Sequence, residues 1–157
     1  MPPFIGVISD THGLLRPEAL EPLQGADLII HAGDVGDQRI LDRLAAIAPV
    51  HAVRGNTDHG PFGAALPHDA VVRWRGKLIY VLHILADLAL DPAAAGFNAV
   101  IFGHSHKPEI TETPEVLYFN PGSAGPRRFS LPVTVGRLSL KGDALAAEIL
   151  PLPGIPE

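Results

Sequence analysis

Five short apolar runs in this chain each end next to residues that can bind a metal ion. The runs are mostly aliphatic and cover residues 4–8, 28–31, 50–53, 78–82 and 99–102, as buried β-strands would. The polar residues that follow them read Asp10-Thr11-His12, Gly33-Asp34, Gly55-Asn56, His83 and Gly103-His104-Ser105-His106. A sheet with parallel strands collects ligands beyond the carboxyl ends of its strands, so these side chains are expected to converge. The series predicts one polar site.

The segments between the runs indicate how the chain is layered. Leu, Ile and Ala recur at spacings near three and four, which predicts helices over 16–23, 38–47 and 87–95. The first half is therefore expected to be β-α-β-α-β. Short runs separated by turns predict antiparallel strands in the second half, over 71–74, 78–82, 116–119, 133–140 and 144–150. Together the two halves predict an α/β (α+β) fold of two β-sheets packed face to face with helices outside.

Length and the absence of internal repeats favour a single domain over residues 1–157. The 157 residues, 46% of them hydrophobic, are enough to bury a real core. The tail 151–157 contains three prolines, and we expect it to lie loose on the surface.

Charge and hydropathy narrow the partners that the chain can have. A net charge of −5 with only 12 Lys and Arg argues against strong nucleic-acid binding. No window approaches the roughly 20 apolar residues of a membrane helix, so no membrane partner is expected. The first apolar run is too short for a signal peptide, which favours a cytoplasmic location. The oligomeric state stays open, and a homo-oligomer is one alternative.

Seven of the polar residues form a plausible ligand set for two metal ions. The chain has no cysteine, so any ligands must be nitrogen or oxygen atoms. The set supplies two carboxylates, one amide oxygen and four imidazoles: Asp10, His12, Asp34, Asn56, His83, His104 and His106. Imidazole with carboxylate suits Mn, Fe, Zn, Co or Ni better than Mg or Ca, and Mn is our first expectation. Two such ions about 3.5–4 Å apart generate a hydroxide from water and neutralise charge on a transferring phosphoryl group.

Each motif alone has a structural alternative. Gly33-Asp34 fits a strand-to-helix turn with a capping Asp, and Gly55-Asn56 fits a turn that needs a positive φ. His31 and His51 are interpreted as strand residues and His68 as a loop residue, outside the ligand set. The order and placement of the motifs together favour the metal site.

The same motifs resemble a known family. The order Asp-x-His, Gly-Asp, Gly-Asn, His, Gly-His-x-His is similar to that of the calcineurin-like metallophosphoesterase superfamily. The flanking stretches "VISDTHG", "IIHAGDV", "VRGNTD", "IFGHSHKP" and "FNPGSAGPRRFS" resemble its small single-domain bacterial and archaeal phosphodiesterase branch. The resemblance covers about residues 4–140 and implies a four-layer αββα sandwich. The branch also includes the retromer subunit, which keeps the fold but works as a protein-interaction scaffold.

The resemblance also implies roles for individual residues. Asp10, His12 and His106 would bind the first ion, Asp34 would bridge, and Asn56, His83 and His104 would bind the second. The implied reaction is hydrolysis of a small phosphate ester, most simply a phosphodiester, by attack of a metal-bound hydroxide. Asp34 and Asn56 are therefore expected in the catalytic machinery as well. Asp58 follows Asn56 closely, and we expect it to orient a ligand or contact substrate.

Two departures from the family pattern concern proton transfer. Larger relatives place a histidine directly after the motif asparagine, where this chain has Thr57. The small branch follows the His83 position with Gly and a second His, whereas this chain has Ile84 and Leu85. Bulky apolar residues there are expected to narrow and dry that side of the site, which predicts slow turnover with normal metal binding.

Three classes of function fit these features. The first is a dinuclear metal-dependent phosphodiesterase or phosphatase. The second is a scaffold that binds metal but turns over weakly, and the third is a nuclease. A scaffold would expose a broad apolar patch and hydrolyse no aryl phosphodiester. A nuclease would degrade oligonucleotides faster than small diesters.

Overall fold

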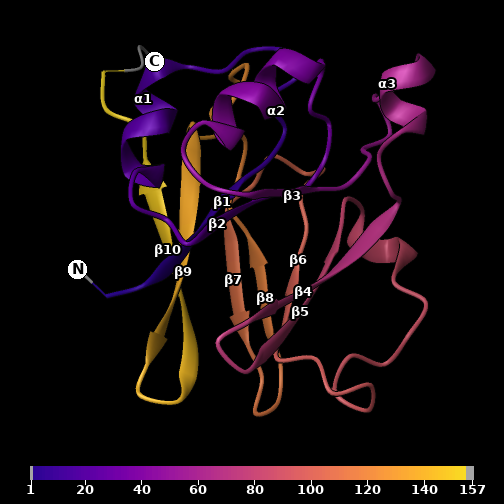
Figure 1. Cartoon of the computed structure of the whole chain (residues 1–157), viewed down its shortest axis with the longest axis vertical. Helices are drawn as coiled ribbons and strands as arrows, with labels where there is room; N and C mark the ends of the chain where they lie inside the picture. Colours follow the sequence, from indigo (N-terminus) through magenta and orange to yellow (C-terminus); the bar gives the residue numbers. More distant parts are fainter. Residues whose placement is uncertain (1, 155–157) are drawn as a thin grey trace.

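The computed structural model describes residues 2–154, which form two mixed five-stranded β-sheets (Figure 1). The first sheet has the order β10 (Ala144–Pro151), β9 (Thr134–Lys141), β1 (Phe4–Ile8), β2 (Leu28–His31) and β3 (Val50–Ala52). The second has the order β4 (Asp69–Trp74), β5 (Lys77–Leu82), β6 (Ala99–Ile101), β8 (Leu117–Asn120) and β7 (Glu109–Glu112). The predicted fold class is confirmed.

Each sheet contains three neighbouring parallel strands, and its remaining strands join by antiparallel pairing. β1, β2 and β3 run parallel, as do β5, β6 and β8. β9 pairs with β1 and β10 in antiparallel fashion, and β4 and β7 are antiparallel edges of the second sheet. Figure 1 shows the yellow β9–β10 hairpin beside the indigo β1, although they lie at opposite ends of the described chain. The long β9–β10 hairpin thus forms one edge of the first sheet.

Alternating side chains divide the interior into three apolar layers. In β2, Ile30 points into the layer between the sheets, and Ile29 points outward toward the helices. In β5, Val81 joins the central layer, while Tyr80 and Leu82 join a third layer on the outside of the second sheet. Because successive strand residues face opposite sides, these continuous apolar runs serve two layers at once.

Short helices cover the outer face of the first sheet. The helix α1 (Pro17–Leu20) continues into a 3₁₀ turn, η1 (Glu21–Leu23), and α2 (Gln38–Ala45) follows β2. Asp37 caps α2 by accepting a hydrogen bond from the Arg39 amide. Ile40 and Leu44, one helical turn apart, are buried against the sheet. No helix in the described part of the chain is long and apolar enough to cross a membrane.

The predicted helix over 87–95 is wrong. A 3₁₀ turn, η2 (Leu85–Asp87), is followed by irregular chain up to β6. Leu85, Leu88 and Leu90 pack against the outer layer of the second sheet from this irregular backbone. The alanines at 93–95 offer little apolar surface, so burial of the leucines rather than helix propensity sets the path.

Three smaller features also differ from the sequence-based expectations. A one-turn helix, α3 (Gly60–Ala64), was not predicted because its two glycines and proline give no helical signal. The edge strand β7 was not predicted either, because it is exposed along its length and lacks apolar alternation. The tail is not loose at its start, since Pro151 belongs to β10 and the Leu152 amide donates to the Val133 carbonyl. Residues 155–157 of that predicted tail lie outside the described residues.

Candidate metal centre

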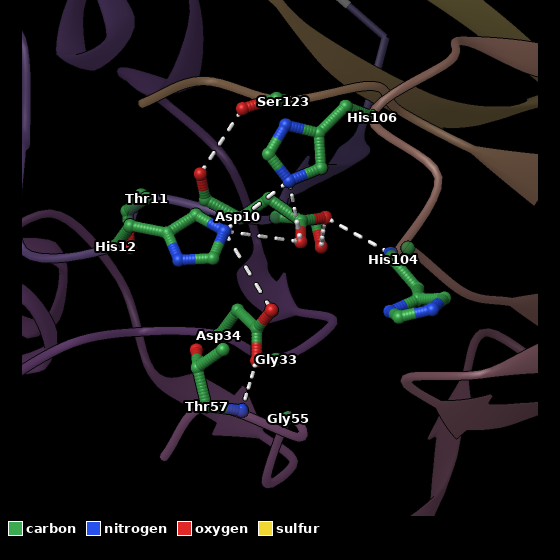
Figure 2. Close-up of polar contacts among 12 residues, drawn as sticks. Asp10, Thr11, His12, Gly33, Asp34, Gly55, Thr57, His104, His106 and Ser123 are labelled. Carbon is green, nitrogen blue, oxygen red and sulfur yellow. Dashed lines mark hydrogen bonds and ion pairs between the residues drawn. The ribbon is translucent and has the colours of Figure 1, made fainter. Parts of the chain in front are cut away.

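The loops after β1, β2, β3, β5 and β6 meet at one end of the two sheets. Within the first sheet, Ile8 lies opposite His31 and His31 opposite Ala52, so three strands end at the same level. The second sheet is joined to this end by the His104 amide, which donates to Asp10 Oδ2 at 3.1 Å. The structure thereby brings all seven predicted ligands into one region. Figure 2 shows Asp10, His12, Asp34, His104 and His106 there.

A first group of ligand atoms surrounds Asp10. Asp10 Oδ1 lies 3.7 Å from His12 Nε2 and 3.4 Å from His106 Nε2. The two Nε2 atoms lie 3.2 Å from each other. Figure 2 shows both imidazole rings directed at the Asp10 carboxylate. These three residues can hold one ion between them.

A second group surrounds Asp34. Asp34 Oδ2 lies 3.2 Å from His83 Nε2, and ligand atoms of Asp34, His83 and His104 all lie within 4.8 Å of one another. Asn56 Oδ1 is 3.0 Å from His104 Nδ1. His83 Nδ1 lies 2.7 Å from the Ala32 carbonyl, and this contact turns Nε2 toward the carboxylates. Four side chains therefore face a second position.

The two groups share their carboxylates. Asp34 Oδ2 lies 3.6 Å from His12 Nε2 of the first group and 3.2 Å from His83 Nε2 of the second. Asp10 Oδ1 in turn lies 3.9 Å from His83 Nε2. The position of Asp34 between imidazoles of both groups suits a residue that bridges two ions.

Buried side-chain atoms that lack hydrogen-bond partners test whether the site fits a metal ion. Among the described residues, Asp10 Oδ1, His83 Nε2 and His106 Nδ1 are buried side-chain atoms that make no hydrogen bond. An unsatisfied buried polar group costs about 1–3 kcal/mol. Asp10 Oδ1 and His83 Nε2 both face the other ligand atoms, so cations there would satisfy them. The donor set of imidazole, carboxylate and amide oxygen therefore fits divalent transition metals.

The backbone at the ligands is held in an unusual conformation. Seven described non-glycine residues have a positive φ, and five of these are predicted ligands: Asp10, His12, Asp34, His104 and His106. Such residues are uncommon and concentrate at functional sites, where surrounding structure must hold them. The pattern sets these loops apart from ordinary turns.

Two glycines allow the loops to approach one another. A Cβ atom on Gly55 would lie 2.0 Å from Asp34 Oδ1, and one on Gly103 would lie 2.7 Å from Asp10 Oδ2. Neither position can accept a larger residue without moving a carboxylate. The glycines in the sequence motifs thus serve close approach to the ligands.

The electrostatics keep the carboxylates ionised. Burial acts to raise the pKa of Asp10, but contacts with His106 and His12 outweigh it and hold the pKa below its ordinary value. Burial likewise opposes the effect of His83 on Asp34, whose pKa is lowered to about 2. The adjacent carboxylates raise the pKa of His12, chiefly through Asp10. The site therefore carries fixed negative charge that attracts cations.

His31 supports the loops from beneath the site. It is fully buried, and burial lowers its pKa to about 4. Its Nδ1 accepts from the Gly33 amide at 3.1 Å, and its Nε2 lies 3.0 Å from Thr11 Oγ1. Thr11 then donates to the Val35 carbonyl. This neutral imidazole links the first two ligand loops, in keeping with its interpretation as a packed strand histidine.

Asp58 is turned toward backbone amides. Its carboxylate accepts from the amides of Val35, Gly36 and Gly55 at 3.2, 3.1 and 2.9 Å. These donors belong to the loops that carry Asp34 and Asn56. Asp58 therefore ties two ligand loops together, which suits positioning rather than contact with substrate.

Three polar side chains that the sequence reasoning did not assign to the site also orient Asp10 and its neighbours. Ser9 donates to Asp10 Oδ2 at 2.7 Å, and Ser123 donates to the Asp10 carbonyl. Asn120 donates to the Gly103 carbonyl. Ser9 stands next to a ligand, and Asn120 and Ser123 lie in the "NPGS" stretch, so adjacency to motifs was the only available signal.

The two departures from the family pattern have separate structural consequences. The Thr57 amide donates to Asp34 Oδ1 at 2.9 Å, so this position orients a ligand through its backbone. Ile84 lines a cavity of about 290 Å³ beside Asn56 and His83. Leu85 is half-buried and packs on the outer apolar layer of the second sheet. Only Ile84 therefore touches the space next to the ligands.

Comparisons with known proteins agree with this geometry. A family model for the calcineurin-like phosphoesterase superfamily domain matches residues 4–143, and the chain belongs to this superfamily. It is 35% identical to a probable metallophosphoesterase of Methanocaldococcus jannaschii, over 95% of this chain and 81% of that protein. It is 28% identical to the phosphodiesterase YfcE of Escherichia coli, over 83% of this chain and 84% of that protein.

A solved structure shows the same fold. Vps29 of Entamoeba histolytica, solved in complex with Zn²⁺, superposes with a TM-score of 0.73 at 20% identity. The match covers 95% of this chain and 99% of that structure. The likeness shows that this chain and Vps29 share the same two-sheet fold.

Proposed function

We propose that this protein is a dinuclear metal-dependent phosphodiesterase that hydrolyses small phosphodiesters. The observation that carries the proposal is the pair of buried carboxylates, Asp10 and Asp34, which each face imidazoles of both ligand groups. A site built only for packing would not leave Asp10 Oδ1 buried without a partner.

The chain's residues have distinct roles in this proposal. Asp10, His12 and His106 would hold one ion, Asn56, His83 and His104 would hold the other, and Asp34 would contribute to both. When bound, the two ions supply a nucleophile from water and neutralise charge on the phosphoryl group. Burial of the Asp10 and Asp34 carboxylates strengthens their attraction for the ions. Asp58 fixes the spacing of the loops that carry Asp34 and Asn56.

Diesters are favoured over monoesters on two grounds. The E. coli relative is itself named a phosphodiesterase. Few described basic side chains lie near the ligands: Arg54 lines the adjacent cavity, Lys107 directly follows His106, and Arg128 acts on the His12 imidazole. A diester carries less negative charge than a monoester and so needs less compensation from basic side chains.

The decisive experiment compares two substrates with defined metals. Metal-stripped protein is resupplied in turn with Mn, Fe, Zn, Ni, Co or Mg and assayed on bis-p-nitrophenyl phosphate and p-nitrophenyl phosphate. We expect faster hydrolysis of the diester, with Mn among the best metals. The Asp34→Asn variant should be inactive, whereas Asp42→Asn, an exposed aspartate on α2, should match the unmodified protein. Faster hydrolysis of the monoester would make the protein a phosphatase instead.

A scaffold with weak turnover is the second candidate. Ile84 and Leu85 in place of the branch's Gly and His favour it, and Vps29 shares the fold. No hydrolysis of either ester with any metal would support this candidate. Faster cleavage of oligonucleotides than of small diesters would support the third candidate, a nuclease. We further propose that residues 1–157 act as one domain in the cytoplasm.

A further inference from the structure

A cavity lies beside the second ligand group, between two loops that come from different sheets. It has a volume of about 290 Å³ and is lined by Arg54, Asn56, His68, His83, Ile84 and Asp87, among others. Asn56 and His83 are predicted ligands, so the cavity opens directly off the metal centre. A phosphoryl group held at the centre would direct one ester substituent into this space.

His68 and Asp87 face each other in this cavity. His68 Nε2 lies 3.9 Å from Asp87 Oδ2, and their side chains are 58% and 49% exposed. Asp87 ends the turn η2, only four residues after His83. The Arg54 amide donates to the Pro67 carbonyl at 2.7 Å, which fixes His68 beside the loop that carries Asn56. The pair therefore joins the β3–β4 connection to the β5–β6 connection.

We propose that this cavity binds the leaving alcohol of the phosphodiester and that His68, held by Asp87, donates a proton to it. The inference rests on the proposed function. Neither Thr57 nor Leu85 supplies an imidazole where relatives have one, and Leu85 packs away from the cavity. His68 is the imidazole outside the ligand set that lines the cavity.

The charges around His68 suit a proton donor. Asp87 places a carboxylate against its imidazole, Asp58 adds a second carboxylate to the cavity, and Arg54 adds an opposing positive charge. His83 is the other titratable group that lines the same space. Because Nε2 faces Asp87, Nδ1 is the nitrogen left for the ester oxygen.

The proton balance of the step is complete. A bond forms between a water oxygen and phosphorus, and the bond from phosphorus to the leaving oxygen breaks. The Nδ1 proton of His68 moves to that oxygen and yields the alcohol. The attacking water releases one proton to solvent, and solvent returns one to His68. Diester and water thus give monoester and alcohol with no further reactant.

A pair of leaving groups tests the proton transfer. p-Nitrophenolate departs readily without protonation, whereas phenolate depends on it much more. We expect His68→Gln to lower kcat on diphenyl phosphate by about tenfold or more, and on bis-p-nitrophenyl phosphate by about twofold or less. Asp87→Asn should have a smaller effect of the same kind. His51→Gln, an exposed histidine on β3, should change neither rate.

Three further measurements separate a catalytic role from a structural one. Metal content and thermal midpoint should be unchanged in His68→Gln. The fall of kcat at high pH on diphenyl phosphate should disappear in this variant. Equal losses on both esters, or no loss on either, would overturn the inference while leaving the phosphodiesterase proposal intact.

A binding measurement tests the cavity even if the protein hydrolyses neither ester. If the unmodified protein hydrolyses neither ester, the proposed function and the proton-donor role both fail. Binding is then judged from the His68 imidazole signals in the NMR spectrum of Zn-loaded protein titrated with methyl phenylphosphonate. We expect these signals to shift to saturation, with His51 signals unmoved. Unmoved His68 signals would overturn the cavity's role as well.

Discussion

The Nε2 atoms of His12 and His106 lie 3.2 Å apart, and both face the same oxygen, Oδ1 of Asp10. A single proton on one nitrogen can satisfy this contact, but Asp10 Oδ1 then keeps no hydrogen bond of its own. Burial of this oxygen makes that arrangement costly. Replacement of the shared proton by a cation would satisfy both nitrogens and the carboxylate together.

The first prediction concerns how many ions bind and where. Protein saturated with Mn should hold two ions per chain by elemental analysis. His106→Ala should weaken the ion that shares Asp10 and His12, and His104→Ala the ion near His83. Asp34→Asn should weaken both, since its carboxylate faces both groups. Anomalous scattering from crystals of each variant shows which position is lost.

Either of two results would contradict this assignment. One is a single ion per chain in saturated unmodified protein. The other is loss of the same position in the His104 and His106 variants. His51→Gln serves as a control, because this exposed histidine lies on β3 outside the site.

The second prediction concerns Asp58. In Asp58→Asn, one carboxylate oxygen that accepts backbone amides becomes an NH₂ group, so an amide donor among Val35, Gly36 and Gly55 loses its acceptor. We expect a loss of about 1–3 kcal/mol in the free energy of unfolding. Metal affinity should fall by about 10–100-fold, as for other residues that orient ligands. Urea denaturation and metal titration measure the two effects.

The matched control for Asp58 is Asp42→Asn. Asp42 is exposed on α2, and its carboxylate accepts only from the Gln38 side chain among the described hydrogen bonds. A substrate-contacting role for Asp58 would instead lower kcat without changing stability or metal affinity.

The sequence predicted the ligand loops because local patterns carry that information. Ile29 and Ile30 are both apolar since β2 is covered on both faces, and a continuous apolar run of this kind is typical of a central strand. The polar residues after these runs then fall at one end of the sheets. The identity and order of the motifs were therefore sufficient to place the candidate ligands together.

Features that depend on packing between distant segments were not predictable in this way. Residues 87–95 have helical spacing, but the outer face of the second sheet requires Leu85, Leu88 and Leu90 in an irregular path. His68 looks like an ordinary loop residue until the β3–β4 connection is seen against η2. Asp58 likewise gains its role from the Val35 and Gly36 amides, which lie more than twenty residues away.

The third prediction concerns acid stability and His31. Burial lowers its pKa from 6.5 to about 4 in the folded protein. As the pH falls below 6.5, His31 of the unfolded chain binds a proton, whereas His31 of the folded protein does not bind one until about pH 4. The free energy of unfolding therefore decreases in this window. The loss should approach about 3 kcal/mol by pH 4. The lowered carboxylate pKa values of Asp10 and Asp34 cost stability only at still lower pH.

The measurement is urea denaturation of metal-stripped protein between pH 7 and pH 4. His31→Gln should be less stable at pH 7, because it loses the contacts with Thr11 and Gly33. Its stability should also fall less steeply between pH 6.5 and pH 4. Parallel curves for the variant and the unmodified protein would show that His31 does not govern this window.

The last prediction links Ile84 and Leu85 to His68. In Ile84→Gly/Leu85→His, a small residue opens the cavity, and we expect the freer glycine backbone to let the new histidine, two residues after His83, turn from the outer layer into that space. If His68 already donates the proton, this double change should alter kcat on diphenyl phosphate by less than about threefold. In the His68→Gln background it should restore about tenfold or more. The non-additive rates would show that the two histidines perform the same step.

Replacement of Leu85 removes an apolar side chain from the outer layer of the second sheet, so these variants should have a lower thermal midpoint, which must be measured beside the rates. A folded triple variant that stays as slow as His68→Gln would break this link, and the leaving oxygen would then take its proton from another donor.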